Sequence, residues 1–203
     1  MSRTLIAILR GLKPDEAADI GMALVEAGIS IIEVPLNSPQ PLDSIETLAK
    51  TLGDRATVGA GTVLTTDQVQ AIADVGGQII VSPNCDLEVI AKTKALGLQS
   101  YPGVFTPTEC FAALKAGADG LKIFPAEVMQ AKGIKAIRAV LPPETDVFAV
   151  GGVGADNLGE WHAVGVTGFG IGSSLYKPGR SAEEVATKAR ELVKAYDEVI
   201  GHA

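Results

Sequence analysis

Short apolar segments recur along the chain at a spacing of roughly 20–26 residues, which is the period of repeated β-strand and α-helix units. Eight such segments are candidate strands: Leu5–Leu9, Ile31–Leu36, Thr57–Gly61, Gln78–Ser82, Leu98–Gly103, Gly120–Phe124, Asp146–Val150 and Gly168–Gly172. Their apolar residues run continuously instead of alternating with polar ones, as in parallel strands that are buried on both faces. This pattern predicts an α/β protein with a parallel sheet.

The stretches between these strands carry helix start and stop signals. Pro14 stands in the first turn of one predicted helix, and hydroxyl side chains suited to helix N-caps precede three others: Thr65, Thr106 and Ser181. Eight strands alternating with eight helices predict a compact (β/α)₈ TIM barrel, with residues 1–203 forming a single domain. The alternative is an open, doubly wound sheet, but no Gly-x-Gly-x-x-Gly motif follows the first strand.

Charge and composition exclude several classes of partner. The net charge is −7 and basic residues form no block, so binding to nucleic acid or to an anionic membrane is not expected. No apolar run approaches the roughly 20 residues that span a bilayer, and Arg10 interrupts the short apolar start, which predicts a cytoplasmic protein without a signal peptide. Cys85 and Cys110 have no CxxC spacing, which indicates free thiols. His162 and His202 are the only histidines, so neither a histidine metal site nor a Ser-His-Asp triad is expected. No cofactor is expected.

Lys122 is the one lysine inside a predicted apolar strand, whereas the other ten lie in polar or helical stretches. Burial disfavours an ammonium group and lowers its pKa, and an amine that is neutral near pH 7 can form a Schiff base with a ketone. The alternative is a lysine that reaches solvent from the strand end. Glu33 lies between apolar neighbours in the second strand, where a carboxyl either pairs with a cation or takes a raised pKa. It could therefore move protons beside Lys122, or it could only fill the barrel as an ion pair with Arg10 or Lys122.

In a TIM barrel the active site lies where the strands end, so residues at these ends are the candidates for binding substrate. Glycine-rich loops follow the last two strands, at Gly151-Gly152 and at Gly172-Ser173. Bare backbone N–H groups at these two positions often hold phosphate, although a Gly-Gly pair can also be an ordinary turn.

Four further strand-end residues are candidates for the site. Arg10 could clamp a carboxylate or a phosphate through two parallel hydrogen bonds, and Thr62 offers a hydroxyl beside a glycine-rich turn. Phe124 could shield a Schiff base at Lys122 from water or pack in the core. Pro83 ends the fourth strand and would line the mouth of the pocket.

Five segments together carry a resemblance to a known family: Ile6–Gly11, Glu33–Pro39, Gly59–Val63, Leu121–Pro125 and Val150–Val153. With these motifs the chain resembles the class I 2-keto-3-deoxy-6-phosphogluconate/phosphogalactonate (KDPG/KDPGal) aldolases from end to end. The resemblance implies a Schiff base on Lys122 and acid/base chemistry by Glu33. It also implies a homotrimer without a metal, and substrate contacts from a set of strand-end residues: Arg10, Thr62, Gly151, Gly152 and Ser173.

Two pocket positions differ from the gluconate-type pattern, which has arginine where this chain has Asn37 and threonine where it has Val150. Both differences resemble the phosphogalactonate branch. Without a hydroxyl at Val150, a hydrogen bond that could select one substrate epimer is lost. The expected reaction is the cleavage of 2-dehydro-3-deoxy-6-phosphogalactonate to pyruvate and glyceraldehyde 3-phosphate, with the gluconate epimer as the alternative substrate.

Two other classes of protein remain as rivals. A sugar-phosphate isomerase or epimerase would use Glu33 for proton abstraction and Lys122 only as a charge, without a covalent adduct. A non-catalytic barrel would bind a phosphorylated ligand and leave it intact.

Overall fold

The computed structural model describes residues 3–201, so the chain ends at 1–2 and 202–203, including His202, lie outside the described residues. The elements follow in the order β1 Leu5–Ile8, α1 Pro14–Ala27, β2 Ile31–Pro35, α2 Pro41–Leu52, a 3₁₀ turn Gly53–Arg55, β3 Thr57–Gly61, α3 Thr66–Asp74, β4 Ile79–Val81, α4 Leu87–Ala95, β5 Gln99–Tyr101, β6 Gly103–Val104, α5 Pro107–Lys115, β7 Leu121–Ile123, α6 Ala126–Arg138, β8 Val147–Val150, α7 Leu158–His162, β9 Gly168–Ile171 and α8 Ala182–Ile200.

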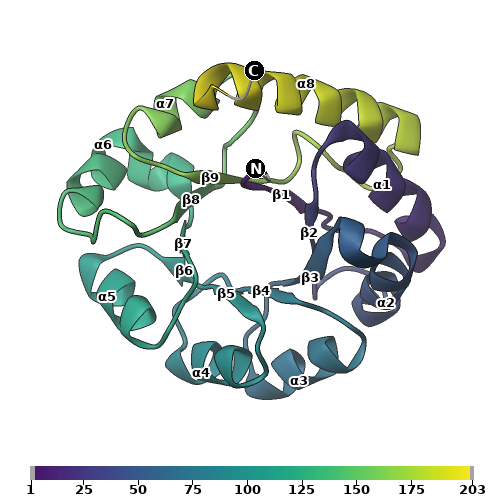
Figure 1. Cartoon of the computed structure of the whole chain (residues 1–203), viewed down its shortest axis with the longest axis horizontal. Helices are drawn as coiled ribbons and strands as arrows, with labels where there is room; N and C mark the ends of the chain where they lie inside the picture. Colours follow the sequence, from purple (N-terminus) through teal and green to yellow (C-terminus); the bar gives the residue numbers. More distant parts are fainter. Residues whose placement is uncertain (1–2, 202–203) are drawn as a thin grey trace.

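The strands form a ring that is enclosed by the helices (Figure 1). All pairings are parallel, in the order β5-β4-β3-β2-β1-β9-β8-β7-β6. The two ends of this order belong to one continuous segment, and backbone N–H groups of Asp119 and Lys122 donate to the carbonyl groups of Ser100 and Pro102 at 3.0 and 2.9 Å. These bonds close the barrel, so the predicted (β/α)₈ barrel is confirmed and the open sheet is excluded.

The predicted fifth strand differs from the observed one. Instead of a single strand over Leu98–Gly103, β5 pairs with β4 and β6 pairs with β7. Pro102 stands between them, and because proline has no backbone N–H it interrupts the ladder at that residue. The fifth position of the barrel is therefore built from two short strands.

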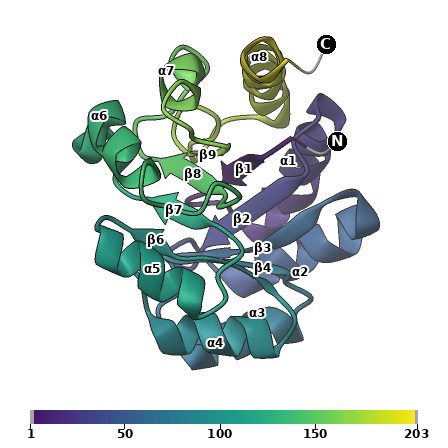
Figure 2. The ribbon, with the colours of Figure 1, turned by 60° about the vertical axis from the view of Figure 1, so that its left-hand side comes forward.

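The predicted helix caps are present. Thr65, Thr106 and Ser181 each accept a hydrogen bond from a backbone N–H of the first helical turn, and Pro14 opens α1. Figure 2 shows α1 and α8 side by side next to β1. The Arg3 side chain ties the start of the chain to α8, with Nε 2.7 Å from Oδ1 of Asp197. Within residues 3–201, no helix has both the length and the apolar character needed to cross a bilayer.

Alternate residues of each strand face opposite sides of the barrel wall. The outward set packs beneath the helices in the main apolar core, whereas a separate cluster fills the barrel interior: Ile6, Ile79, Val81 and Phe148, with Ile31 and Tyr101 packed against it. The Tyr101 ring meets the Phe148 ring edge to face, with centroids 5.0 Å apart. Lys122 lies beside Phe148 in the register of β7 and β8, so a polar residue shares this interior.

Candidate active site

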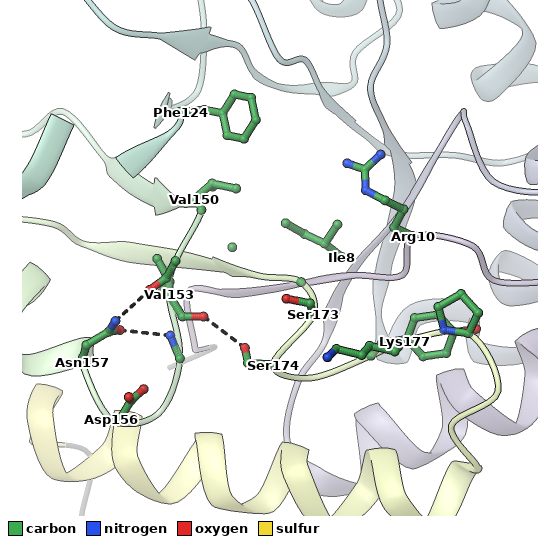
Figure 3. A pocket seen from close by; sticks show the side chains of 17 residues that line it. Ile8, Arg10, Phe124, Val150, Val153, Asp156, Asn157, Ser173, Ser174 and Lys177 are labelled. Atoms are coloured by element: carbon green, nitrogen blue, oxygen red, sulfur yellow. Dashed lines mark hydrogen bonds between the residues drawn. The ribbon is translucent and has the colours of Figure 1, made fainter. Parts of the chain in front are cut away.

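A cavity of about 480 Å³ opens at the carboxyl ends of β1, β7, β8 and β9 (Figure 3). Seven of the residues predicted from the sequence line it: Arg10, Phe124, Val150, Gly151, Gly152, Gly172 and Ser173. Residues that sequence reasoning did not select also line it, among them Asp156, Asn157 and Lys177. The end of the barrel predicted to hold the site is therefore the end that carries this cavity.

Lys122 and Glu33 project into the barrel from opposite sides of the ring. Glu33 is on β2 and Lys122 is on β7, and three strands, β1, β9 and β8, separate them along the sheet. Both side chains are buried, with 2% of Glu33 and 7% of Lys122 exposed. Each group shifts the pKa of the other, although the two residues are far apart in sequence.

Burial disfavours the charged form of both groups. It raises the pKa of the Glu33 carboxyl to about 7, against the opposing effects of Lys122, Arg10 and the backbone N–H of Gly61. Burial also lowers the pKa of the Lys122 ammonium, against the attraction of Glu33, and the positive charge of Arg10 lowers it further. The site thus holds an amine shifted toward its neutral, nucleophilic form beside a carboxyl that can both give and take a proton near pH 7.

The carboxyl of Glu33 interacts with the backbone N–H of Gly61, but its neighbours leave it incompletely paired. Oε2 of Glu33 is buried without a hydrogen bond, and Glu33 forms no ion pair with any described residue. The ion pair with Arg10 or Lys122, considered from the sequence as a structural role, is not formed. A buried carboxyl oxygen without a hydrogen bond is costly, and such a cost is typical of a group kept for chemistry.

Phe124 connects Lys122 to the cavity. Nζ of Lys122 lies 4.8 Å from the centroid of the Phe124 ring, and Phe124 is 36% exposed at the cavity wall. Phe124 therefore does not pack in the core, which was the structural alternative for it. Its ring lies between a wall of the cavity and the lysine nitrogen.

Gly61 is a residue of this site that sequence reasoning did not select. A Cβ atom at Gly61 would overlap the carboxyl group of Glu33, with Oε2, Cδ and Oε1 as its three nearest atoms. Gly61 pairs with Pro35 in the register of β2 and β3, one inward position beyond Glu33. Only glycine leaves this space open. The motif Gly59–Val63 includes Gly61, but the sequence does not show why glycine is needed there.

Arg10 and Asn37 form a hydrogen-bonded pair at the mouth of the barrel. Nη1 of Arg10 donates to Oδ1 of Asn37 at 2.6 Å, and the guanidinium group points toward the cavity in Figure 3. Asn37 does not itself line the cavity. The asparagine at this position thus acts on the pocket through Arg10.

Asn157 fixes the loop after β8 through two hydrogen bonds to its backbone. Gly151 and Gly152 have φ values of 101° and 70°, which a side chain would strain. Asn157 donates from Nδ2 to the Gly152 carbonyl at 2.8 Å and accepts from the Gly154 N–H at 3.0 Å. The N–H groups of Gly152 and Ser173 donate to no described residue, so two backbone donors remain available at this wall.

Thr62 and Pro83 follow β3 and β4 and do not line the cavity. Thr62 has a φ of 59°, a left-handed conformation that costs a β-branched residue about 1–3 kcal/mol. Such strain is frequent at functional sites, and Thr62 directly follows Gly61 and its contact with Glu33. Within residues 3–201, no group of three or more His, Cys, Asp or Glu side chains is arranged to hold a metal ion.

Comparison with known proteins agrees with this geometry. Residues 2–188 match the family model for KDPG and KHG aldolase. A protein of Rhizobium meliloti (strain 1021) named "Probable 2-dehydro-3-deoxy-6-phosphogalactonate aldolase" is 54% identical, over 99% of this chain and 95% of that protein. The "2-dehydro-3-deoxy-6-phosphogalactonate aldolase" of Escherichia coli (strain K12) is 50% identical, over 97% and 96%. A solved structure described as "Native KDPGal structure" superposes with a TM-score of 0.97 and 48% identity, over 99% of this chain and 98% of that one. The chain therefore belongs to the KDPG and KHG aldolase family, as its sequence motifs predict.

Proposed function

We propose that the protein is a class I aldolase that cleaves 2-dehydro-3-deoxy-6-phosphogalactonate to pyruvate and glyceraldehyde 3-phosphate. The observation that carries this proposal is the pair of Lys122 and Glu33, a buried amine of lowered pKa facing a buried carboxyl of raised pKa inside the barrel. The substrate follows from the two relatives that share half or more of the sequence over nearly the full length. The barrel acts as a single catalytic domain in this proposal.

The reaction begins with covalent bond formation. The neutral amine of Lys122 attacks the C2 ketone, and Glu33 moves the protons as the carbinolamine loses water to become an iminium ion. Glu33 then accepts the proton of the C4 hydroxyl, the C3–C4 bond breaks, and its electron pair passes into the iminium to give an enamine. Glyceraldehyde 3-phosphate leaves, the enamine is protonated at C3, and hydrolysis releases pyruvate and the free amine.

Residues around the mouth of the barrel bind the two anionic ends of the substrate. In this proposal Arg10 and Thr62 hold the carboxylate, while the Gly151-Gly152 and Gly172-Ser173 loops hold the phosphate. The available N–H groups of Gly152 and Ser173 support the second assignment.

Val150 and Asn37 favour the galactonate epimer. Val150 lines the cavity with a side chain that offers no hydrogen-bonding group, and Asn37 holds Arg10 where the gluconate-type pattern has a second arginine. The cavity therefore has less polar contact with which to select the gluconate epimer.

The chain is proposed to form a homotrimer. Four large apolar side chains are 40–49% exposed on segments that follow neighbouring strands: Leu64, Leu87, Phe105 and Phe111. Exposed apolar side chains of this size are frequent at interfaces between subunits. Light scattering coupled to gel filtration measures the mass of the assembly, and a monomeric mass would contradict this part of the proposal.

A cytoplasmic location is proposed as well. Cys85 and Cys110 are both free thiols, which is the usual state of cysteines in a reducing compartment.

The main experiment supplies both epimeric substrates and measures pyruvate release. We expect cleavage of the galactonate epimer with the higher kcat/KM. In parallel, borohydride treatment in the presence of pyruvate should add the mass of a reduced pyruvyl group to the protein. An isomerase or a binding protein would release no pyruvate and gain no mass. The absence of pyruvate release, or the absence of the mass gain, would refute the aldolase assignment.

A further inference from the structure

Lys177 lies in the same cavity but has no part in the site described so far. It follows β9 by six residues, its side chain is exposed, and it lines the cavity together with Gly172 and Ser173. Figure 3 shows the side chain running below Ser173 toward Ser174. Among residues 3–201, no acceptor lies within hydrogen-bonding or ion-pair distance of its ammonium group.

The backbone on both sides of Lys177 is held in place. The preceding residue, Tyr176, is 2% exposed and its hydroxyl donates to Oε1 of Glu16 at 3.0 Å. On the other side, the Arg180 N–H donates to the Lys177 carbonyl at 3.1 Å, and Nη1 of Arg180 donates to the Leu175 carbonyl at 2.8 Å. The Cα atom of Lys177 is thus anchored at the cavity edge, while its ammonium group keeps its full hydrogen-bonding capacity.

A phosphate group at this end of the cavity would need a positively charged partner. The glycine loops offer only neutral N–H and hydroxyl donors. Asp156 lines the same wall, and Oε2 of Glu127 would lie 2.7 Å from a Cβ atom at Gly152. A phosphate monoester carries a charge of about −1.5 to −2 at pH 7, which two neighbouring carboxylates repel. Arg10 is hydrogen-bonded to Asn37 on the β1 and β2 side of the mouth.

We propose that Lys177 binds the phosphate group of the substrate, as the cation that completes the Gly151-Gly152 and Gly172-Ser173 loops. This assignment rests on the proposed aldolase function, because it uses the substrate bound to Lys122 to place the phosphate. Nζ of Lys122 lies beside the Phe124 ring, and Phe124 and Lys177 line the same cavity, so the carbon chain of a substrate attached at Lys122 would lead toward this wall.

The test replaces Lys177 by methionine, which keeps most of the side-chain volume and removes the charge. The matched control is Lys115→Met, since Lys115 is exposed on α5 and does not line the cavity. Loss of a charge-assisted hydrogen bond should raise KM for the phosphorylated substrate about tenfold or more in Lys177→Met and leave Lys115→Met at the wild-type value. Lys177→Arg should restore most of the binding. The KM for the unphosphorylated analogue of the substrate should differ little between Lys177→Met and the wild type. The pyruvate concentration that gives half-maximal trapping by borohydride should also differ little between them.

A direct binding measurement separates this proposal from the aldolase assignment. Calorimetric titration with glycerol 3-phosphate needs no turnover, and its affinity should fall about tenfold or more in Lys177→Met. Equal affinity in Lys177→Met and wild type, or no binding by either, would overturn the role of Lys177. So would an equal loss for phosphorylated and unphosphorylated ligands, which would indicate a structural defect. Wild-type protein that binds glycerol 3-phosphate through Lys177 but releases no pyruvate would refute the aldolase function alone.

Discussion

The carboxyl group of Glu33 occupies the space that a side chain at Gly61 would need. The three nearest atoms to a Cβ at Gly61 are the carboxyl carbon and both oxygens of Glu33. Glu33 is 2% exposed, so a carboxyl displaced by a new side chain would have to move within a closely packed interior. The glycine on β3 therefore positions the acid/base group on β2.

Gly61→Ala should displace the Glu33 carboxyl and lower kcat by about 10²-fold or more, because a misplaced general acid/base loses most of its contribution. The overpacking should also cost about 1–3 kcal/mol of unfolding free energy. The control is Gly159→Ala on α7, where the new Cβ would lie at an ordinary 3.7 Å from Val199. Steady-state kinetics and urea unfolding of both variants measure these effects. A Gly61→Ala enzyme with wild-type kcat would show that Glu33 works from another position.

Lys122→Ala should abolish turnover and remove the mass gain seen after borohydride treatment with pyruvate, because the Schiff base needs this amine. Mass spectrometry of the intact protein gives the readout. Lys115→Ala is the control and should gain mass as the wild type does. Trapping that persists in Lys122→Ala would identify another lysine as the nucleophile.

Glu33→Gln keeps the shape of the side chain and removes its ability to exchange a proton. We expect kcat to fall by roughly 10²–10⁴-fold, the usual contribution of a general acid/base. Glu88→Gln, which changes an exposed carboxyl on α4, should have no effect on kcat. Activity of Glu33→Gln near that of the wild type would reduce Glu33 to a structural role.

Glu33→Gln should also change the free energy of unfolding, by an amount that depends on pH. The pKa of Glu33 is about 7 in the folded protein, above its ordinary 4.5, so between these values the folded state binds more protons than the unfolded state. Stability therefore falls as pH rises through this window, and the full cost is present above pH 7. Glu33→Gln should be close to the wild type in unfolding free energy near pH 4 and should exceed it at pH 8. Urea unfolding at both pH values measures the difference, and an equal difference at the two would contradict the raised pKa.

Asn37→Ala removes the 2.6 Å hydrogen bond that holds the Arg10 guanidinium at the cavity mouth. Because Arg10 remains charged but loses its orientation, KM for the substrate should rise about three- to tenfold with kcat little changed. Asn84→Ala is the control, because Asn84 lies in the loop after β4, is exposed, and its side chain has no hydrogen bond among the described residues. An unchanged KM would show that Arg10 keeps its position without Asn37.

The sequence alone predicted most of the local structure and the two central residues of the site, Lys122 and Glu33. The apolar runs predicted the strands because parallel strands buried on both faces need continuous apolar residues. Thr65, Thr106 and Ser181 predicted helix starts because capping depends on neighbours within one turn. Lys122 and Glu33 could be selected from local sequence as well, because a charged residue inside an apolar strand is recognisable without knowledge of its partner. The error at Pro102 arose where a proline interrupts a strand without ending it.

Only the tertiary structure decided which of these residues act together. Lys122 and Glu33 come from strands that face each other across the ring, and closure of the barrel is what brings them near enough to shift each other's pKa. The space at Gly61, the Arg10–Asn37 bond and the position of Lys177 at the cavity wall likewise depend on contacts between distant segments. Local patterns report burial and caps because these depend on near neighbours, whereas desolvation and charge coupling depend on what the fold places opposite each residue.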